Sequence, residues 1–403
     1  MSRLLIFLSL FLCIYGTLHL YVLVKVRRAY YLQGISYILL FVLLTFLMVA
    51  PIQARILEAQ DHAILALVTA WIGNLWMGFL FLFICLALPL DGYHMMLVAL
   101  QNLANTDLTH LMLSRRQSIV LTTVLALGLM TYGAYEAYHI RIERITQYST
   151  KIPASAKPIR IVQLSDVHLG PMLYPGRAAQ ITALLAAIHP DLLVSTGDLV
   201  DGRIQNSSAV ASEFKAIATP LGKFAVTGNH EFYAGIDRTT AFIRQAGFTL
   251  LRNQSVGVGK VLVIAGVDDP TGGQGKGLHE AGLLAGITGN KFILLLKHRP
   301  VVDPKALGHF DLQLSGHTHQ GQIFPLNLLM MLRYPFKPGF HQLRPHAGLY
   351  VSRGTGTWGP PIRLLAPPEI TIIDLLPEAA KTPKTPRATP KNQPLKSKRA
   401  IKK

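Results

Sequence analysis

Four long apolar runs in the first third of this 403-residue chain constrain its fold more than any other feature. They are Leu4–Val24, Tyr30–Val49, Ala63–Leu88 and Ser118–Ala137, with at most one Asp, Glu, Lys or Arg in each. Each run reaches the roughly 20 residues that a helix needs to cross a bilayer. The sequence therefore predicts an all-α transmembrane domain of about four helices over residues 1–140.

A secretory signal peptide is the alternative for the first run. That run is longer than the usual apolar core of a signal peptide, and no small-residue cleavage motif follows it. The three further runs favour a multi-pass anchor in the cell membrane. Between the third and fourth runs, Asp91–Ser114 is only half apolar, and we expect an interfacial helix there.

Basic residues near the ends of the runs bear on membrane orientation. Lys25, Arg27 and Arg28 follow the first run, and Arg115 and Arg116 precede the fourth. Because Lys and Arg are enriched in cytoplasmic loops, this pattern puts the rest of the chain on the non-cytoplasmic side. Three basic residues after the last run argue the other way: Arg141, Arg144 and Lys151.

The net charge of +18 is concentrated partly in the C-terminal residues 377–403. This tail carries nine Lys or Arg residues against one Glu, with repeated Thr-Pro steps and no apolar period, which predicts disorder. Its cations suit anionic membrane lipids, each contributing about 1 kcal/mol near the surface, or they only keep the tail soluble. Nucleic acid is not an expected partner, because no aromatic residues alternate with the basic ones.

Residues 158–376 alternate short apolar strands with helical patterns, after a linker over 141–157. This order predicts mainly parallel β-α-β units that continue into a second sheet packed on the first. The expected helices are Gly176–Ile188, Ser208–Ala218 and Arg238–Gln245. The expected strands are Ile159–Leu164, Leu192–Thr196, Phe224–Thr227, Val261–Ala265, Phe292–Leu296, Leu312–Leu314, Leu349–Ser352 and Ile370–Asp374. Both cysteines, Cys13 and Cys85, lie in the apolar runs, which excludes a cysteine nucleophile from this region.

Five polar segments follow strands of this region. They are Asp166-Val167-His168, Gly197-Asp198, Gly228-Asn229-His230-Glu231, Lys297-His298-Arg299-Pro300 and Gly316-His317-Thr318-His319. In open α/β sheets, ligands collect beyond the carboxyl ends of strands, so we expect these loops to converge. Carboxylate, amide and imidazole donors suit a pair of divalent ions, and Mn, Fe, Zn and Co all accept such ligands. The pattern predicts metal-assisted hydrolysis.

Hydrolysis of a phosphate ester needs an ionised water and neutralised phosphoryl oxygens. Two cations roughly 3.5–4 Å apart supply both, through a hydroxide that bridges them. A carboxylate between the ions relieves their repulsion, and we expect Asp198, at a sharp Gly-Asp turn, to take this place. A cationic imidazole beside such a pair can protonate the leaving oxygen, which is the role we expect for His230.

These five segments resemble the signature of the calcineurin-like metallophosphoesterases, and the resemblance covers roughly Lys157–Leu376. It implies an α/β fold, a four-layer α/β/β/α sandwich, with a dinuclear centre. It also implies that one metal is held by Asp166, His168, Asp198 and His319, and the other by Asp198, Asn229, His298 and His317. By the same resemblance His230 is the general acid and no metal ligand, and Asp201 would orient it.

Two other features indicate which branch of the family the sequence resembles and which substrates it excludes. Phosphatases that act on proteins place Arg directly after the residue that matches Asp201, whereas Gly202 precedes Arg203 here. This departure argues against a phosphate-clamping Arg203 and against a protein substrate. The segments Tyr350–Gly356 and Pro361–Arg363 are similar to the membrane-associated YkuE- and YaeI-like branch, and the apolar N-terminus is similar to the transmembrane metallophosphoesterases.

The branch implies phosphodiester or pyrophosphate substrates, some of them lipid-linked. Arg353 and Arg363 are candidate phosphate contacts, and Leu326–Phe340 is either a lipid-dipping segment or a packed insertion. The sequence thus predicts a membrane-anchored dinuclear phosphoesterase acting on a phosphate ester, and it leaves the oligomeric state open. The alternative is a membrane sensor or scaffold that binds metal or phosphate without turnover.

Overall fold

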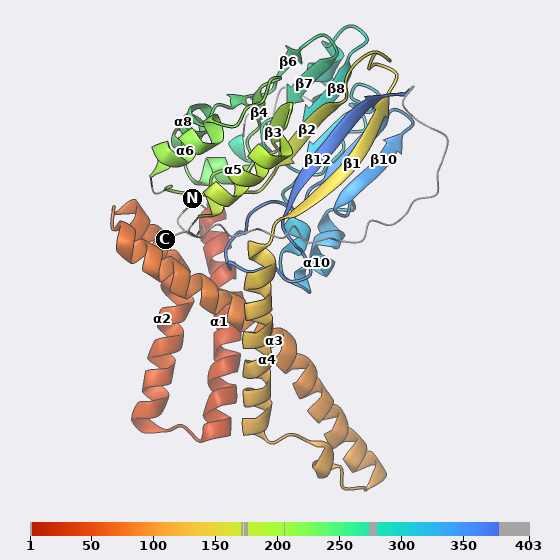
Figure 1. Cartoon of the computed structure of the whole chain (residues 1–403). Helices are drawn as coiled ribbons and strands as arrows, with labels where there is room; N and C mark the ends of the chain where they lie inside the picture. The colour runs from red at the N-terminus through yellow and green to blue at the C-terminus, as the bar shows by residue number, and fades with distance from the viewer. Residues whose placement is uncertain (1, 171, 173–175, 205, 274–279, 379–403) are drawn as a thin grey trace, which may run out of the picture.

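The computed structural model describes residues 2–170, 172, 176–204, 206–273 and 280–378. An α/β domain stands on one end of a bundle of four long helices, as Figure 1 shows. The tail predicted to be disordered lies outside the described residues from residue 379 onward.

The bundle consists of α1 (Ser2–Tyr30), α2 (Gly34–Ala59), α3 (Ala63–Ala104) and α4 (Arg115–Tyr138). All four are long and apolar enough to cross a membrane, which agrees with the four predicted helices. The separate interfacial helix predicted over Asp91–Ser114 is wrong, because α3 continues through Pro89 as far as Ala104. The charge of Asp91 is accommodated inside the helix by Lys25 and by the Tyr21 hydroxyl of α1.

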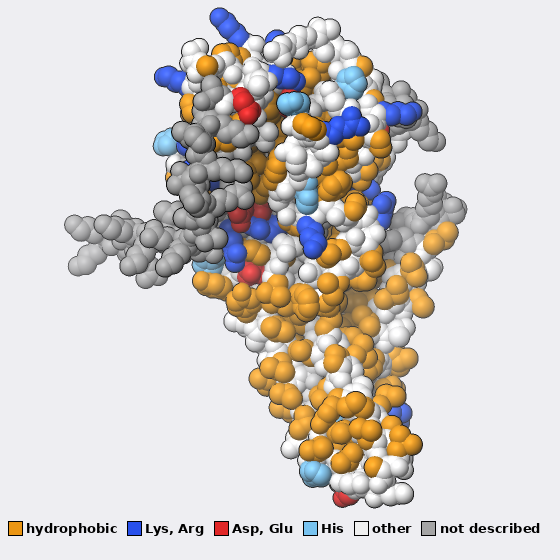
Figure 2. Space-filling model, turned by 90° about the vertical axis from the view of Figure 1, so that its right-hand side faces the viewer, with side chains coloured by type: hydrophobic (Ala, Val, Ile, Leu, Met, Phe, Trp, Pro, Cys, Tyr) orange, Lys and Arg blue, Asp and Glu red, His pale blue; other side chains and the backbone are white. Residues whose placement is uncertain are grey.

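Small residues bring the helices of the bundle together. A Cβ at Gly73 of α3 would lie 2.9 Å from the backbone nitrogen of Pro51 in α2, and Ala50 and Ala70 are buried in the same seam. In a lipid bilayer the hydrophobic effect does not drive helices together, because lipid tails are as apolar as the side chains. Close packing at small residues is then a main source of helix association. The bundle surface is covered by apolar side chains with few charges among them, as Figure 2 shows.

The α/β domain contains two six-stranded sheets. The first has the order β1-β12-β2-β3-β4-β5, and the second the order β10-β11-β9-β8-β7-β6. The strands of the first sheet are β1 (Arg141–Ser149), β12 (Glu369–Pro377), β2 (Ile159–Leu164), β3 (Leu192–Ser195), β4 (Lys223–Ala225) and β5 (Thr249–Leu250). Those of the second are β10 (Gly339–Arg344), β11 (Ala347–Val351), β9 (Leu312–Ser315), β8 (Phe292–Leu296), β7 (Leu262–Gly266) and β6 (Gln254–Val258).

Three apolar cores hold the layers together. Helices α5 (Arg177–Ile188), α6 (Ser207–Lys215) and α8 (Ile236–Gln245) cover the first sheet, burying Leu185 and Phe214 against it. The two sheets enclose a second core that includes Phe292. Short α9 (Glu280–Ala285) and the turn before β9 cover the outer face of the second sheet. The predicted α/β/β/α layering is therefore confirmed, with a thin fourth layer.

The predicted linker over 141–157 is wrong in part, because Arg141–Ser149 forms β1. This strand runs parallel to β12, with Arg141 opposite Glu369 and Ser149 opposite Pro377. Its partner lies more than 200 residues away in the sequence, so no local pattern marks it as a strand. As a result α4 passes almost directly from the bundle into the first sheet (Figure 1).

The bundle and the α/β domain share an apolar core. Ile323, Ile362 and Leu364 belong to the same buried cluster as side chains of α1, α2, α3 and α4. The loop 357–365 approaches the helices at two glycines: a Cβ at Gly78 would lie 3.1 Å from Pro360, and the Gly133 carbonyl accepts a hydrogen bond from the Arg363 N–H at 2.9 Å. Loops that follow the strands of the second sheet therefore rest on the bundle.

Candidate metal centre

All seven predicted ligands lie on loops that follow β2, β3, β4, β8 and β9. Hydrogen bonds between these loops bring them together: the Asp166 N–H donates to the Gly197 carbonyl, and the His168 N–H donates to the Asp198 carbonyl, both at 3.0 Å. The His317 N–H donates to both carboxylate oxygens of Asp166 at 3.0 Å. The expected convergence of these residues is thus observed in the described part of the chain.

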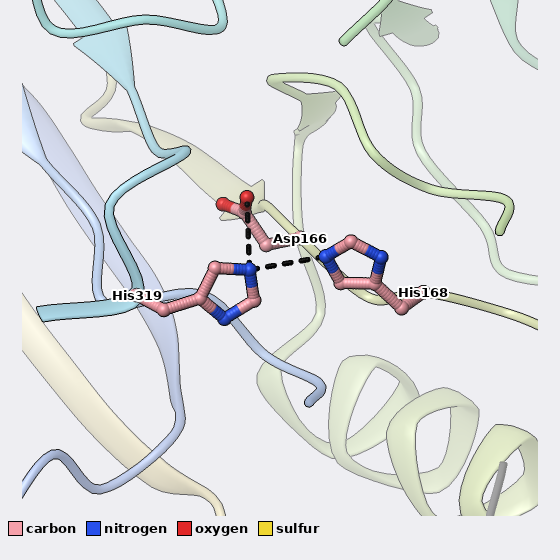
Figure 3. A group of neighbouring side chains, drawn as sticks. All are labelled: Asp166, His168 and His319. Carbon is pink, nitrogen blue, oxygen red and sulfur yellow. Dashed lines mark hydrogen bonds and ion pairs between the residues drawn. The ribbon is translucent and has the colours of Figure 1, made fainter. Parts of the chain in front are cut away.

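Asp166, His168 and His319 form one group, shown in Figure 3. The Nε2 atoms of His168 and His319 lie 3.0 Å apart, and His319 Nε2 lies 3.4 Å from Asp166 Oδ1. All three side chains are buried. Donor atoms of three different residues thus face one small volume.

Asp198, His298 and His317 form a second group. His298 Nε2 lies 3.1 Å from Asp198 Oδ2 and 3.1 Å from His317 Nδ1. On the other side of its ring, His298 Nδ1 lies 2.9 Å from the Thr196 carbonyl oxygen, to which it donates. This bond turns Nε2 toward the group, the orientation that is usual for histidine ligands of metals.

Asp198 lies beside both groups, because its Oδ2 belongs to the second and also lies 3.9 Å from His168 Nε2 of the first. Asn229 begins α7 (Asn229–Tyr233) beside this carboxylate, and its buried Oδ1 has no hydrogen-bond partner among the described residues. A buried amide oxygen without a partner costs free energy unless something satisfies it. A cation next to Asp198 would do so.

Five of the seven predicted ligands have a left-handed backbone, which is uncommon outside glycine. Asp166, His168, Asp198, His317 and His319 have φ values between 47° and 70°. Each such residue costs on the order of 1 kcal/mol or more, and such strain clusters at functional sites. The neighbouring glycines allow the loops to close: a Cβ at Gly316 would lie 2.2 Å from Asp166 Oδ2.

The electrostatics of the centre favour bound cations. Burial raises the pKa of the Asp166 carboxyl, and burial also opposes ionisation of Asp198. The charge and hydrogen bond of His298 nevertheless hold the pKa of Asp198 well below its usual range. Burial lowers the pKa of His298, but Asp198 and Asp166 outweigh it and raise this pKa to about 10. The two carboxylates therefore stabilise a positive charge at this place.

His317 and His319, in contrast to His298, are neutral. Burial, together with the nearby charges of His298 and Arg299, lowers the pKa of His317 to about 3. Burial and the Arg363 cation lower the pKa of His319 well below its ordinary value. Neutral imidazoles and ionised carboxylates are the forms that bind metals. The donor set therefore fits two divalent ions.

Comparisons with known proteins agree with this geometry. A family model described as calcineurin-like phosphoesterase matches residues 159–321. An "Uncharacterized metallophosphoesterase" of Aquifex aeolicus is 39% identical over 255 residues, which cover 62% of this chain and 97% of that protein. The chain belongs to the calcineurin-like metallophosphoesterases.

Other relatives share the same domain. A "Transmembrane protein with metallophosphoesterase domain" of Danio rerio is 32% identical over 272 residues, which cover 64% of this chain and 62% of that protein. The "Uncharacterized metallophosphoesterase YkuE" of Bacillus subtilis is 31% identical over 282 residues, which cover 65% of this chain and 98% of that protein. The metallophosphoesterase is thus a hydrolase of phosphoester bonds, of a family that uses a dinuclear metal centre.

His230 lies next to the two groups of ligands, on α7. Its backbone N–H donates to Asp198 Oδ1 at 2.8 Å, and its Nδ1 lies 2.7 Å from Asp201 Oδ1. Burial lowers the pKa of His230, but the hydrogen bond and charge of Asp201 outweigh it and raise this pKa above its ordinary value. A ring nitrogen of His230 also lies within 4.8 Å of donor atoms of His168 and Asp198, so the ring lies at the edge of the two groups of ligands.

Glu231 has a larger role than the helix-start charge that its position predicts. It is fully buried, and its carboxylate accepts hydrogen bonds from the N–H groups of Asp198, Val200 and Gly228 at 2.7–3.0 Å. Burial and the charge of Asp198 raise the pKa of Glu231 to about 7. Glu231 thus joins the loops after β3 and β4. In the sequence, only its position three residues after Gly228 could have indicated this role.

The two arginines expected to contact phosphate lie close to the metal centre, but their guanidinium groups are engaged by other residues of the protein. Arg363 is fully buried, donates to the carbonyls of Gly356 and Ala366, and lies 3.0 Å from His319 Nδ1. Arg353 pairs with Glu143 of β1 and with Glu369 of β12. Their guanidinium groups are used to hold loops, which sequence spacing alone does not reveal.

The bundle also reaches the metal centre, which the sequence does not predict. Arg55 Nη2 of α2 lies 3.5 Å from Asp201 Oδ1, the oxygen that holds His230. Next to it, the Arg203 N–H donates to Glu58 Oε1 at 3.0 Å, and the Arg203 side chain pairs with Asp61. Arg203 therefore contacts the end of the bundle, in agreement with the argument against a phosphate clamp.

Proposed function

We propose that this metallophosphoesterase hydrolyses a phosphodiester or pyrophosphate bond of a lipid-linked substrate at the membrane surface. The observation that carries the proposal is the apolar surface beside the metal centre. The exposed side chains of Trp358, Leu329 and Leu332 form this surface. The loops of the same domain pack on a bundle whose helices have the length and composition of membrane spans.

Two divalent ions, when bound, lower the pKa of a water molecule and neutralise phosphoryl oxygens. The two ions share Asp198 in this proposal. The first would be held by Asp166, His168, Asp198 and His319, and the second by Asp198, Asn229, His298 and His317. The left-handed backbones and the hydrogen bonds of Glu231 preorganise these side chains, so little reorganisation is needed when substrate arrives.

His230 is the proposed general acid. Asp201 fixes the ring through Nδ1 and stabilises its cationic form, so Nε2 presents a proton to the leaving oxygen. Proton donation of this kind contributes roughly 10²–10⁴-fold to hydrolysis when the leaving group is a poor one. His230 would thus discriminate between alkoxide and activated leaving groups.

The rim of the metal centre supports an apolar substrate. The ring of Trp358 lies 5.7 Å from the ring of His230 and is 54% exposed. Helix α10 (Leu326–Arg333) has no buried residue, and Leu332 is 85% exposed. Figure 1 shows α10 on the side of the α/β domain toward the bundle. This arrangement favours the lipid-dipping alternative over a packed insertion.

A cavity of about 350 Å³ lies between this helix and the segment that carries ligand His319, and Lys337 and Arg353 add positive charge to its lining. Thr318 and Gln320, on either side of ligand His319, line it together with Met330 and Met331 of α10. The ring of Tyr334 at the same cavity lies 5.3 Å from that of His317. An apolar chain that emerges from the bilayer would reach the centre through this cavity while its phosphate meets the ions.

The proposed location of the α/β domain is the non-cytoplasmic face of the cell membrane, with the four helices crossing it. The basic residues next to the turns between helices support this orientation. Helix α1 ends and α4 begins at the end of the bundle away from the α/β domain (Figure 1). Lys25 and Arg28 belong to the last two turns of α1, and Arg115 is the first residue of α4. Because basic loops stay in the cytoplasm, the α/β domain would lie outside.

The test is hydrolysis by the detergent-purified, Mn²⁺-loaded full chain of two substrate pairs. One pair is phosphatidylglycerol and its deacylated headgroup; the other is a polyprenyl pyrophosphate and inorganic pyrophosphate. We expect kcat/KM to be at least about tenfold higher for the lipid member of one pair, because apolar contacts add binding energy. Equal values within both pairs would contradict the lipid-linked substrate.

Leu332→Asp and Leu332→Met separate lipid access from chemistry. The first change places a charge on α10 and should lower kcat/KM for the lipid substrate alone, whereas the second keeps the surface apolar and should have no effect. Hydrolysis of the soluble bis-p-nitrophenyl phosphate should be the same in all three proteins. A loss of that activity in Leu332→Asp would mean that α10 acts on the metal centre itself.

A further inference from the structure

A second cavity, of about 560 Å³, lies between α1, α3 and α4, toward the end of the bundle away from the metal centre. Its volume falls within the roughly 300–1,000 Å³ that is typical of sites for small ligands. Leu20 and Val24 of α1 and Met95 of α3 give it an apolar wall, and all three side chains are also exposed on the bundle surface. The cavity is therefore accessible from the side of the bundle that lipid would cover.

The lining of this cavity also carries positive charge. Lys25, Arg28 and Arg115 line it, and Asp91 is the single acidic residue among the lining residues. Asp91 pairs with Lys25 and accepts a hydrogen bond from Tyr21 Oη at 2.6 Å. Arg28 and Arg115 have no ion pair with a described acidic residue, so two positive charges remain unbalanced.

A buried hydroxyl group faces the same cavity. Ser118 of α4 lines it and is 3% exposed, yet its Oγ has no hydrogen-bond partner among the described residues. Within a membrane-spanning helix, water is scarce and a buried donor without a partner is costly. The hydroxyl and the two guanidinium groups together are suited to the oxygens of a phosphate.

Neighbouring basic residues provide an internal contrast. The Arg27 guanidinium lies 4.8 Å from the centre of the Tyr37 ring, and that of Arg116 lies 5.6 Å from the Tyr30 ring. Arg116 also donates to the Ala29 carbonyl at 3.1 Å. These two arginines, one residue away from Arg28 and Arg115, have partners within the protein and do not line the cavity.

We infer that this cavity binds the headgroup of an anionic phospholipid, with its phosphate at Arg28, Arg115 and the Ser118 hydroxyl. The acyl chains would leave along Leu20 and Met95 into the bilayer. A free phosphate ion would use the charges but leave the apolar wall without a partner, so the geometry favours a lipid. Anionic lipids are enriched in the cytoplasmic leaflet, which is the side that basic loops favour.

The experiment is native mass spectrometry of the full chain released from nanodiscs that contain equal amounts of phosphatidylglycerol and phosphatidylcholine. We expect the unmodified protein to retain one phosphatidylglycerol in preference to phosphatidylcholine. The double variant Arg28→Ala/Arg115→Ala should lose this preference at least tenfold, and Arg27→Ala, the matched control, should keep it. Gel filtration and helical circular dichroism identify any variant that fails to fold.

Leu20→Trp is the second variant, because it fills the cavity and leaves every charge in place. It should also abolish the preference for phosphatidylglycerol. Equal retention of the two lipids by the unmodified protein would overturn the inference, and so would an equal loss in Arg27→Ala. Retention of phosphatidylglycerol that inorganic phosphate displaces at millimolar concentration would identify a soluble anion site instead of a lipid site. None of these outcomes depends on hydrolysis at the metal centre.

Discussion

The two ends of the helical bundle differ in how their polar groups are satisfied. At the end next to the α/β domain, Arg55 faces Asp201, and Arg203 pairs with Asp61. At the opposite end, Arg28 and Arg115 line a cavity without an acidic partner among the described residues. The charges at the first end are paired between described residues, and we infer that an anionic lipid supplies the partner at the second end.

This difference shows that the bundle is more than an anchor. One end takes part in the surroundings of the metal centre, through the charges near Asp201 and the apolar contacts of Ile362 and Leu364. The other end contains the inferred lipid site. If the two ends act separately, changes at the metal centre should leave the bundle unaffected, and only residues at the first end should alter catalysis.

The largest expected effect is that of Asp198→Asn, which removes the carboxylate shared by both groups of ligands. We expect kcat for bis-p-nitrophenyl phosphate to fall by about a thousandfold, the scale seen when a charge stabiliser of a transition state is removed. Elemental analysis should find fewer than two metal ions per chain. Asp237→Asn, at the exposed start of α8, is the isosteric control and should keep both activity and metal.

His230→Gln should have the next largest effect, because it removes the proposed proton donor. We expect kcat to fall by about a hundredfold for an alkyl phosphodiester, within the range of general acid catalysis. For bis-p-nitrophenyl phosphate the loss should be much smaller, since nitrophenolate leaves without protonation. Equal losses for the two substrates would assign His230 a binding role.

Asp201→Asn should change the pH dependence of catalysis as well as its rate. The Asp201 charge raises the pKa of His230, so its removal lowers that pKa and deprotonates the acid at lower pH. The alkaline limb of the kcat/KM profile should therefore move to lower pH, with a loss of about tenfold at the optimum, typical of a residue that orients a ligand or catalyst. If the alkaline limb of the profile does not move, Asp201 has no part in proton donation.

The smallest expected effect, from Arg55→Ala, tests the contrast between the two ends of the bundle. Arg55 is exposed and 3.5 Å from Asp201, so its charge is screened and kcat should change by less than about threefold. Because its cation opposes protonation of His230, the alkaline limb should move slightly to higher pH, opposite to Asp201→Asn. Arg55→Lys should preserve the limb, and Arg28→Ala at the other end should not move it.

Much of the fold follows from local patterns in the sequence. The strands β2 and β8 have the predicted bounds, Ile159–Leu164 and Phe292–Leu296, because continuous apolar runs bounded by polar residues mark buried strands. The strand β1 has no such run, because charged and polar residues separate its two isoleucines. Its pairing with β12 is decided by contacts between distant segments.

In the candidate site, too, some features follow from the sequence and others do not. The seven proposed ligands could be identified from their order and their places after strands, and six of them belong to the groups of neighbouring donor atoms. The hydrogen bonds of Glu231, the burial of Arg363 and the approach of Arg55 could not be identified, because identical residue types serve as exposed charges in other sequences. Only the surroundings of a side chain distinguish these roles.

By itself, the sequence determined four long apolar helices, an α/β domain after them, and a set of oxygen and nitrogen donors at strand ends. These features depend on length, periodicity and residue type within short segments. The tertiary structure alone decided that Asp198 faces both groups of ligands, that Asp201 meets His230 and Arg55, and that one end of the bundle stays hollow. Each of these results depends on distances between residues far apart in the chain, which packing fixes and composition does not.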